Sequence, residues 1–347
     1  MTLQQLLGIE LPIIQAPMAG AQASAMAIAV SNAGGLGSLP CAMLTAAGLR
    51  NEFRLIASQT NKPINVNFFC HTPAVVDAAR EAAWREKLAP FYAEFGIDPA
   101  TIPSGPGRAA FNDEMADALE EFKPQVVSFH FGLPPDHLLD RVKRIGAKVF
   151  SSATTVAEAL WLEAKGVDAV IAQGLEAGGH RGIFLSDDLT TQVGTLLLLP
   201  QIVRAVKIPV IAAGGIADAA GVKAAMSLGA RGVQIGTAYL LCPEANTSSI
   251  HRAALKSEAA SHTALTNIFT GRPARGIVNR VMRTLGPINP AAPEFPLATS
   301  AIAPLRAKAE AQGSGNFSPL WSGQNATGCK ETGAGELTRE LARLIFA

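Results

Sequence analysis

A ten-residue segment in the middle of the chain combines residue types that suit a ligand-binding loop. Residues 173–182 read Gln-Gly-Leu-Glu-Ala-Gly-Gly-His-Arg-Gly and directly follow a strand-like run, 168–172. Their four glycines permit positive φ angles and let the backbone approach a ligand closely. The imidazole of His180 titrates near neutral pH, so it can move a proton during a reaction. The segment predicts a catalytic loop at the carboxyl end of a barrel strand, and a glycine-rich turn with a solvated His-Arg pair is the alternative.

Two further glycine turns follow strand-like runs later in the chain. The first contains Gly214 and Gly215, and the second is formed by Gln234, Ile235, Gly236 and Thr237. In barrels, the loops after the seventh and eighth strands commonly bind phosphate through backbone N–H groups and a helix N-terminus. Glycine lets the backbone approach the phosphate oxygens, and Thr237 adds a hydroxyl donor. The pair of turns predicts a phosphate site, with ordinary loop connections as the alternative.

Two amides stand at the ends of strand-like runs, where the rest of such a ligand would lie. Asn67 is near the end of the run 63–69, and Gln173 follows the run 168–172. Because amides both donate and accept hydrogen bonds, they suit the pyrimidine edge of a flavin. The backbone around Met18 is expected to support the plane of the ring. Structural amides with satisfied hydrogen bonds are the alternative.

The elements that must position these residues are strands alternating with helices. Strand-like runs occupy residues 12–18, 34–39, 63–69, 125–131, 148–152, 168–172, 208–213 and 232–235. Strands that alternate with helical stretches indicate parallel βαβ units, and eight of them predict an α/β fold of the (β/α)8 barrel type. The competitor is an open doubly wound sheet, but the first strand lacks the glycine-rich turn that such a sheet usually carries.

The alternation is interrupted after the third strand and again after the eighth. We therefore expect residues 1–70 and 124–240 to form the barrel. Residues 71–123 and 241–347 are expected to form an additional, mostly helical lobe over the barrel mouth. The last part of the second segment, 335–346, is predicted as a closing amphipathic helix.

Composition excludes several classes of protein. Of the 347 residues, 48% are hydrophobic and 16% charged, and the net charge of +1 gives no basic footprint for nucleic acid. The apolar runs are too short to span a bilayer, and the N-terminus does not read as a signal peptide. The four cysteines lack metal-ligand spacing, so no metal is predicted and a reduced, cytoplasmic protein is expected.

Several motifs together resemble the nitronate monooxygenase family, formerly called 2-nitropropane dioxygenases, of class I-like type. They are residues 15–20, 65–69, 130–134, 173–182, 212–218, 234–237 and 320–324. The resemblance covers nearly the whole chain. Its combination of motifs is specific, whereas the Gly-Gly and Gly-Thr turns alone are shared with other phosphate-binding barrels.

The resemblance implies an FMN-dependent monooxygenase that oxidises alkyl nitronates with O2 and does not use NAD(P)H. It implies propionate 3-nitronate, a toxic metabolic inhibitor, as the preferred substrate. Single-electron transfer to FMN would give a flavosemiquinone, and a carbonyl product with nitrite or nitrate would leave. The FMN contacts carried over by motif are Met18, Asn67, Gln173, Gly178, Gly214, Gly215, Gln234, Ile235, Gly236 and Thr237. Small-molecule partners and a monomer or homodimer are expected.

His180 is the candidate catalytic residue. It would take a proton from a neutral nitroalkane or, when protonated, stabilise an anionic nitronate. The alternative is that His180 only shapes the loop and does not contact the substrate. His130 and Arg275 are candidates for substrate contact, the latter because Arg suits carboxylates. Arg272 and Arg280 share that argument, and Arg181 is either a source of positive charge or a structural or solvated residue.

Three other functions fit the same motifs. An FMN-dependent NAD(P)H:quinone reductase and a flavin enoyl-reductase would share the barrel and the flavin cradle. A non-catalytic barrel that binds a phosphorylated ligand would share the phosphate turns. The sequence also departs from the resemblance, because some family members are expected to use tyrosines around the substrate and this chain has only Tyr92 and Tyr239.

Overall fold

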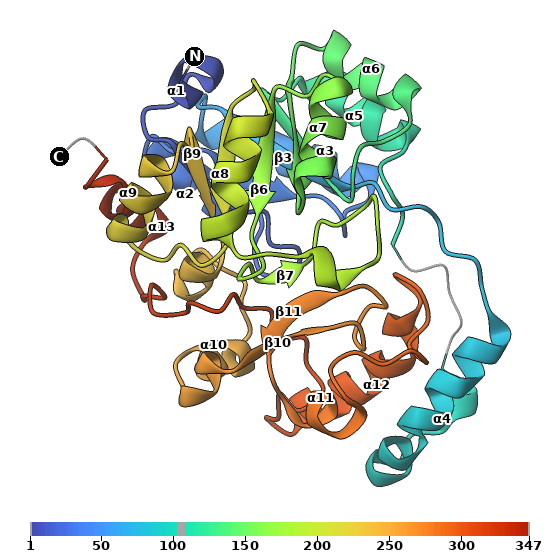
Figure 1. The fold of residues 1–347 in the computed structure, drawn as a ribbon. Coiled ribbons are helices and arrows are strands. Elements are labelled where there is room, and N and C mark those ends of the chain that lie inside the picture. Colours follow the sequence, from blue (N-terminus) through green and yellow to red (C-terminus); the bar gives the residue numbers. More distant parts are fainter. Residues whose placement is uncertain (1, 103–107, 346–347) are drawn as a thin grey trace.

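Eight parallel strands form the centre of the computed structural model, which describes residues 2–102 and 108–345 (Figure 1). In chain order they are β1 (Ile13–Gln15), β2 (Gly37–Pro40), β3 (Ile64–Phe69), β4 (Val126–His130), β5 (Lys148–Ala153), β6 (Ala169–Gln173), β8 (Val210–Ala213) and β9 (Gly232–Ile235). Each overlaps one of the predicted strand runs, so the eight predictions of strand position are confirmed.

The sheet closes on itself. Its strands are neighbours in the order β1-β9-β8-β6-β5-β4-β3-β2, and every pair in this series is parallel. A parallel bridge between Ile14 and Leu36 joins the two ends of the series. The predicted (β/α)8 barrel is confirmed, and the open doubly wound sheet is excluded.

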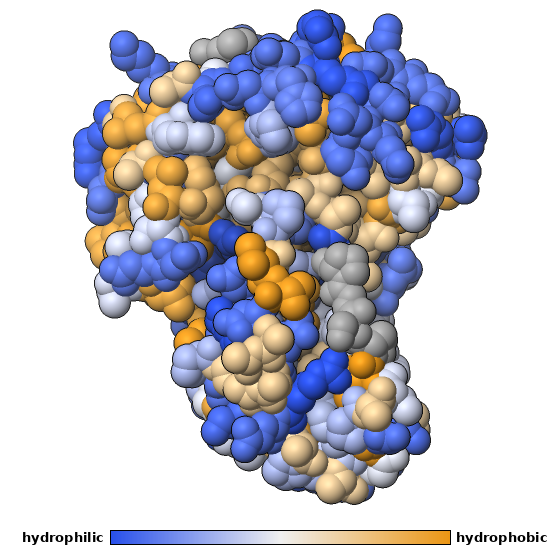
Figure 2. Space-filling model, turned by 90° about the vertical axis from the view of Figure 1, so that its right-hand side faces the viewer, coloured by the Kyte–Doolittle hydropathy of each residue, from blue (hydrophilic) through white to orange (hydrophobic). Residues whose placement is uncertain are grey.

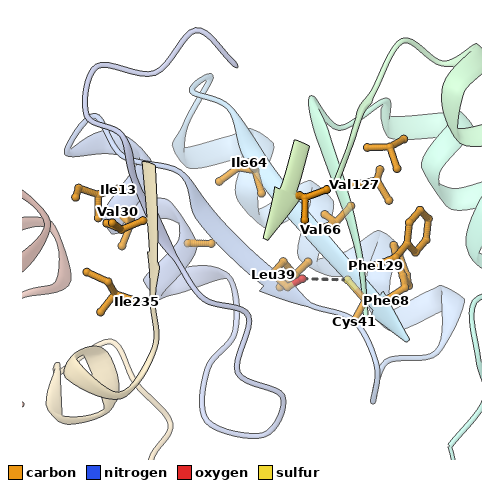
Figure 3. Close-up of a cluster of buried hydrophobic side chains, with 14 of the residues drawn as sticks. Ile13, Val30, Leu39, Cys41, Ile64, Val66, Phe68, Val127, Phe129 and Ile235 are labelled. Carbon is orange, nitrogen blue, oxygen red and sulfur yellow. Dashed lines mark hydrogen bonds between the residues drawn. The ribbon is translucent and has the colours of Figure 1, made fainter. Parts of the chain in front are cut away.

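Alternation along the strands separates two apolar layers, because successive side chains point to opposite faces. Ile14, Val126 and Ile171 pack inside the barrel together with α1 (Leu3–Leu7). Their sequence neighbours, such as Ile13 and Val127, belong to the outer layer that packs against helices. Figure 3 shows this outer layer, including Ile64, Val66 and Phe68 of β3, Val127 and Phe129 of β4, and Ile235 of β9.

Helices cover the outside of the barrel. They are α2 (Ser24–Asn32), α3 (Ala46–Gln59), α5 (Asp113–Phe122), α6 (Asp136–Arg144), α7 (Val156–Ala164), α8 (Thr195–Ala205) and α9 (Ala219–Ser227), with 3-10 turns η2 (Leu189–Thr191) and η3 (Thr237–Leu241). Thr45, Asn112, Thr155 and Asp218 cap α3, α5, α7 and α9 through side-chain oxygens that accept from backbone N–H groups. None of the helices within the described ranges is long and apolar enough to cross a membrane.

A lobe lies beyond the carboxyl ends of the strands, and Figure 2 shows it as a narrower mass below the barrel. It contains α4 (Ala78–Phe95), η1 (Pro99–Thr101), α10 (Ser249–Leu255), η4 (Glu258–Ser261), α11 (Arg280–Leu285) and α12 (Ala298–Ala311). Trp84 and Phe91 of α4 pack with Ile302 and Leu305 of α12 in a second hydrophobic core. The hydroxyl of Tyr92 donates to the carbonyl of Ala301 at 2.6 Å, which fixes the two helices to each other.

The sequence analysis does not anticipate a small antiparallel sheet between lobe and barrel. Its strands are β10 (Thr263–Thr266), β11 (Ala274–Ile277) and β7 (Gly179–His180), in the order β10-β11-β7. The pairing of Ala274 with His180 ties the glycine-rich segment of the barrel to the lobe. This pairing holds the predicted catalytic loop in place between the barrel and the lobe.

Two helices depart from the expected division of the chain. Helix α5 falls in the range 71–123, but its Ala116 and Leu119 belong to the core of the barrel. Helix α13 (Ala334–Ala342) falls in the range 241–347, yet its Leu337 and Leu341 pack in the same core beside α2 and α9. Both helices cover the outside of the barrel, so the lobe is smaller than the predicted segments. Phe346, the predicted end of the last helix, lies outside the described residues.

Candidate active site

Polar side chains replace apolar ones at the carboxyl ends of the inward-facing rows. Asn67, Gln173 and Gln234 occupy inward positions of β3, β6 and β9, because their sequence neighbours belong to the outer layer. The register places Gln173 opposite Ala213, and Ala213 opposite Gln234. The predicted amides therefore meet at one end of the barrel, as the sequence analysis expects.

The two glycine turns lie side by side at this end. Gly214 and Gly215 follow β8 with φ angles of 118° and 71°, a region that favours glycine. Gly236 follows the neighbouring strand β9, and a Cβ added there would lie 3.4 Å from the sulfur of Met18. Turn η3 begins at Thr237, and no side chain caps it. The structure thus brings together Met18 and both turns, as predicted.

The side-chain oxygen of Gln234 is buried and lacks a hydrogen-bond partner among the described residues. A buried acceptor left without a partner costs roughly 1–3 kcal/mol. Asn67, in contrast, donates from Nδ2 to the hydroxyl and carbonyl oxygens of Ser128 at 2.9 and 3.2 Å. Among the amides at the barrel mouth, Gln234 therefore offers an acceptor oxygen that a polar ligand could satisfy.

A C-terminal segment, residues 321–329, crosses both turns. The amide of Gly323 donates to the Thr237 hydroxyl at 2.9 Å, and the Asn325 amide donates to the carbonyl of Gly215 at 3.0 Å. A Cβ added at Gly178 would lie 2.5 Å from the nitrogen of Gly323, so only glycine permits this approach. The sequence analysis notes residues 320–324 as a motif but assigns them no role, and the structure shows that they roof the site.

His180 is held at its main chain from two sides. Its carbonyl oxygen accepts from Nε2 of His130 at 3.1 Å and from the amide of Gln173 at 2.9 Å. The Gln173 oxygen accepts in turn from the backbone N–H of Gly182 at 2.7 Å. Gln173 and His130 thus fix the loop that carries His180, in addition to the contacts predicted for them.

The ring of His180 contacts a single hydroxyl. Its Nε2 lies 3.0 Å from Oγ1 of Thr270, and within the described parts of the chain no hydrogen bond engages Nδ1. Burial lowers the pKa of His180 well below its ordinary value, and the positive charges of Arg108 and Arg272 add to the effect. The imidazole is therefore neutral at physiological pH. Because the Thr270 hydroxyl donates to the carbonyl of Arg272 at 3.3 Å, Nε2 of His180 donates to that hydroxyl, and Nδ1 can accept a proton.

His130 is also a neutral imidazole. Because its Nε2 donates to a carbonyl, its Nδ1 must accept from the hydroxyl of Ser152 at 3.0 Å. Burial lowers the pKa of His130 to about 4. The hydrogen bond to the carbonyl of His180 acts in the opposite direction, because it favours the protonated imidazole. Both ring nitrogens are engaged, so His130 serves here to position His180.

Aromatic rings form a cage around His180. Ring centroids of Phe295, Trp321, Phe131 and Phe69 lie 5.3, 5.6, 5.9 and 6.0 Å from that of His180. Phe69 is the last residue of β3 and Phe131 directly follows β4, so the strand boundaries predict their place at the mouth. No local pattern marks Phe295, which comes from the lobe. The cage makes the surroundings of the imidazole apolar.

Two arginines of this region serve the framework. Arg181 is completely buried and donates to the carbonyls of Gly174 and Gln173 at 2.6 and 2.7 Å. Arg181 is therefore not a solvated residue, and of the structural and solvated alternatives only the buried, structural role remains. Arg275 donates to the carbonyl of Leu175 at 2.9 Å and to the Thr263 hydroxyl at 3.2 Å. It joins the glycine-rich segment to β10, and its predicted contact with substrate stays a prediction.

Known proteins resemble this chain along its full length. The family model described as nitronate monooxygenase matches residues 1–343. A nitronate monooxygenase of Pseudomonas aeruginosa is 44% identical over 339 residues, which cover 97% of this chain and 97% of that one.

Solved structures extend the comparison. A nitroalkane oxidase from Streptomyces ansochromogenes superposes with a TM-score of 0.88 at 37% identity, over 99% of this chain and 98% of that one. FabK from Thermotoga maritima superposes with a TM-score of 0.74 at 27% identity, over 100% and 96% of the two chains. The protein is an oxidoreductase, and its chain belongs to the nitronate monooxygenase family.

Proposed function

We propose that the protein binds FMN at the barrel mouth and oxidises alkyl nitronates with dioxygen. The carbonyl product and nitrite or nitrate would be released, and propionate 3-nitronate would be the preferred substrate. The observation that carries the proposal is the convergence of both glycine turns, the unpartnered oxygen of Gln234 and a neutral His180 at one end of the barrel.

The chain offers a distinct set of groups for each part of FMN. The turns at Gly214–Gly215 and Gly236–Thr237 would bind the phosphate through backbone N–H groups and the Thr237 hydroxyl, beneath residues 321–329. Asn67, Gln173 and Gln234 would contact the polar edge of the ring, and Met18 would lie beside it. Ile235 and Gly178 would contribute main-chain contacts.

When bound, FMN would supply the redox chemistry, and the residues of this chain would position and polarise the substrate. The cage of Phe69, Phe131 and Phe295 excludes water from the substrate beside His180. With a neutral nitroalkane, Nδ1 of His180 accepts the proton on the carbon next to nitrogen, and Nε2 keeps its contact with Thr270. A nitronate already lacks that proton, so His180 then serves mainly to orient the anion.

Two additions to the purified protein test this function. Under anaerobic conditions, propionate 3-nitronate should change the flavin absorbance within the time of a single turnover. NADH should leave the flavin oxidised. With air admitted, the nitronate should consume oxygen and release nitrite or nitrate. Rapid bleaching by NADH without nitronate turnover would instead assign the protein to the reductases. Colourless protein that does not take up FMN would leave a barrel that binds another phosphorylated ligand.

A further inference from the structure

Arg272 places a guanidinium against the aromatic cage. This residue lies in the loop between β10 and β11, and its Cζ is 4.1 Å from the ring centroid of Phe131. Its Nη2 donates to the carbonyl of Ile183, and its Nε is buried without a partner. Among the described residues, no carboxylate forms an ion pair with it, and no hydrogen bond engages Nη1. The guanidinium is therefore fixed in position without a carboxylate paired to it in the described residues.

The ring beneath this guanidinium is held in a strained conformation. Phe131 has a φ of 69°, in the left-handed region that bulky residues rarely adopt. Such a conformation costs on the order of 1–3 kcal/mol and persists where the surroundings impose it. The strained turn sets the Phe131 ring in contact with Arg272 and 5.9 Å, between ring centroids, from His180. The strain thus places a positive charge next to the proposed reaction site.

The carboxylates of Asp187 and Glu158 act to raise the pKa of Arg272, but burial outweighs them, and neither forms an ion pair with it within the described ranges. The imidazoles of His71, His130 and His180 all have pKa values lowered first by burial, and Arg272 lowers each of them further. Being neutral, they supply no negative charge, and Arg108 adds a second positive charge near His180. Because the partly buried guanidinium of Arg272 has no paired carboxylate among the described residues, an anionic ligand would stabilise this arrangement. A guanidinium also presents paired donors that match the two oxygens of a carboxylate.

We propose that Arg272, stacked on Phe131, binds a carboxylate carried by the substrate and so makes the enzyme prefer carboxylated nitronates over simple alkyl nitronates. This role rests on the proposed oxidation of nitronates at His180. Arg272 is a specificity-determining residue: it contacts the remote end of the substrate and takes no part in the transfer of electrons or protons. It also replaces Arg275 as the arginine assigned to this task, because Arg275 is bonded to Leu175 and Thr263.

The matched substrates are propionate 3-nitronate and propyl-1-nitronate, which differ in a carboxylate against a methyl group. The test variant is Arg272→Met, whose side chain can still cover Phe131 without charge. A charge-assisted hydrogen bond is worth about 1.5–3 kcal/mol. The variant should therefore lose about 10- to 150-fold in kcat/KM with propionate 3-nitronate, and less than about threefold with propyl-1-nitronate. Equal losses on both substrates, or no loss on either, would overturn the proposal.

Arg280→Met is the matched control. Arg280 also lies over aromatic rings, 5.4 Å from that of Phe91, but it is paired with Glu94 at 2.6 Å in the lobe. Its replacement should leave the ratio of the two kcat/KM values unchanged. A change in that ratio equal to the one in Arg272→Met would show that the effect is not local to the cage.

A binding measurement separates this proposal from the proposed function. Succinate resembles propionate 3-nitronate in carrying two anionic ends, and butyrate has only one. Calorimetry on the flavin-loaded enzyme should show tighter binding of succinate than of butyrate, and Arg272→Met should abolish the difference. If the wild-type enzyme oxidises neither nitronate but shows this preference, the proposed oxidation fails and the carboxylate site stands. A wild-type enzyme without the preference would overturn the site.

Discussion

Nε2 of His130 lies 3.1 Å from the carbonyl oxygen of His180, so one histidine holds the main chain of the other. The two residues are fifty positions apart in sequence and come from β4 and β7. A second donor, the amide of Gln173, reaches the same oxygen at 2.9 Å. The position of the candidate catalytic imidazole is therefore set by a hydrogen-bonded main chain, while Thr270 makes the one hydrogen bond to its ring within the described residues.

Replacing His130 by leucine should reduce activity while the protein still folds. The change leaves the His180 carbonyl with one donor and removes a buried hydrogen bond, which costs roughly 1–3 kcal/mol. We expect kcat to fall about 10- to 100-fold with propionate 3-nitronate as the catalytic loop shifts. Steady-state kinetics with matched flavin content would measure this. Ser152→Ala removes only the outer hydrogen bond of His130, at 3.0 Å, and should have a smaller effect; a reversed order would contradict this role.

Stability should fall on acidification, and part of the fall should come from His130. Its pKa is about 4 in the native state against the ordinary 6.5, so between these values the unfolded chain binds a proton that the native chain does not. Stability that is present above pH 6.5 is thus lost as the pH falls towards 4, by about 3 kcal/mol in total at about 1.4 kcal/mol per pH unit.

The measurement is chemical unfolding at a series of pH values, compared with His130→Gln, which lacks the titrating group. The difference in unfolding free energy between wild type and variant should change across this pH window. A difference that is constant from pH 7 to 4.5 would mean that His130 does not titrate as described.

His180→Asn should separate the two kinds of substrate. With a neutral nitroalkane, loss of the base at Nδ1 should lower kcat/KM about 10²- to 10⁴-fold. With the corresponding nitronate, which needs no proton abstraction, the loss should stay within about tenfold. The comparison of nitroethane with ethylnitronate by oxygen consumption gives both values. The same change in rate on both would remove His180 from proton transfer.

Gly178→Ala should displace residues 322–324 from the two glycine turns that they cover. Its Cβ would come within 2.5 Å of the nitrogen of Gly323, so residues 322–324 must move away from Thr237. Overpacking of this kind costs about 1–3 kcal/mol, and we expect the purified variant to retain less flavin. Gly48→Ala in α3 is the control, because its backbone does not need glycine and an added Cβ would meet no atom closer than 3.4 Å. Normal flavin content and stability in Gly178→Ala would contradict the role given to Gly323.

Arg181→Met should unfold more easily than any single surface-charge variant. The change leaves the carbonyls of Gln173 and Gly174 and the Gln192 oxygen without their buried donor. Each buried acceptor left without its donor costs about 1–3 kcal/mol, so we expect a loss of about 3 kcal/mol or more. Arg141 forms three ion pairs with exposed carboxylates on α5, and Arg141→Ala should cost about 1 kcal/mol or less per pair. Urea unfolding of both variants tests the order, and equal losses would contradict it.

The sequence predicts the barrel and much of the candidate site for one physical reason. Parallel strands joined by helices all end at the same side of the sheet, so residues that follow strands must meet. Gln173, Gly215 and Gly236 follow β6, β8 and β9 in this way, and the structure brings them together. The family resemblance is confirmed by the match over residues 1–343.

The parts that the sequence does not predict depend on contacts between distant segments. The approach of Gly178 to Gly323 and the pairing of His180 with Ala274 leave no periodic pattern in either partner. Helix α13 is amphipathic, but its pattern does not tell which surface it covers. Arg181 looks like a surface residue in the sequence, and only the fold shows that three oxygens surround its guanidinium.

The segment that covers the two glycine turns is synthesised after the strands that carry those turns. Residues 321–329 follow every strand of the barrel, and β1 finds its partner β9 only after more than two hundred residues have been synthesised. During translation the nascent chain therefore carries His180 well before residues 321–329 can cover the mouth of the barrel. Enclosure of this end of the barrel thus requires contacts that form only after all eight strands have been synthesised.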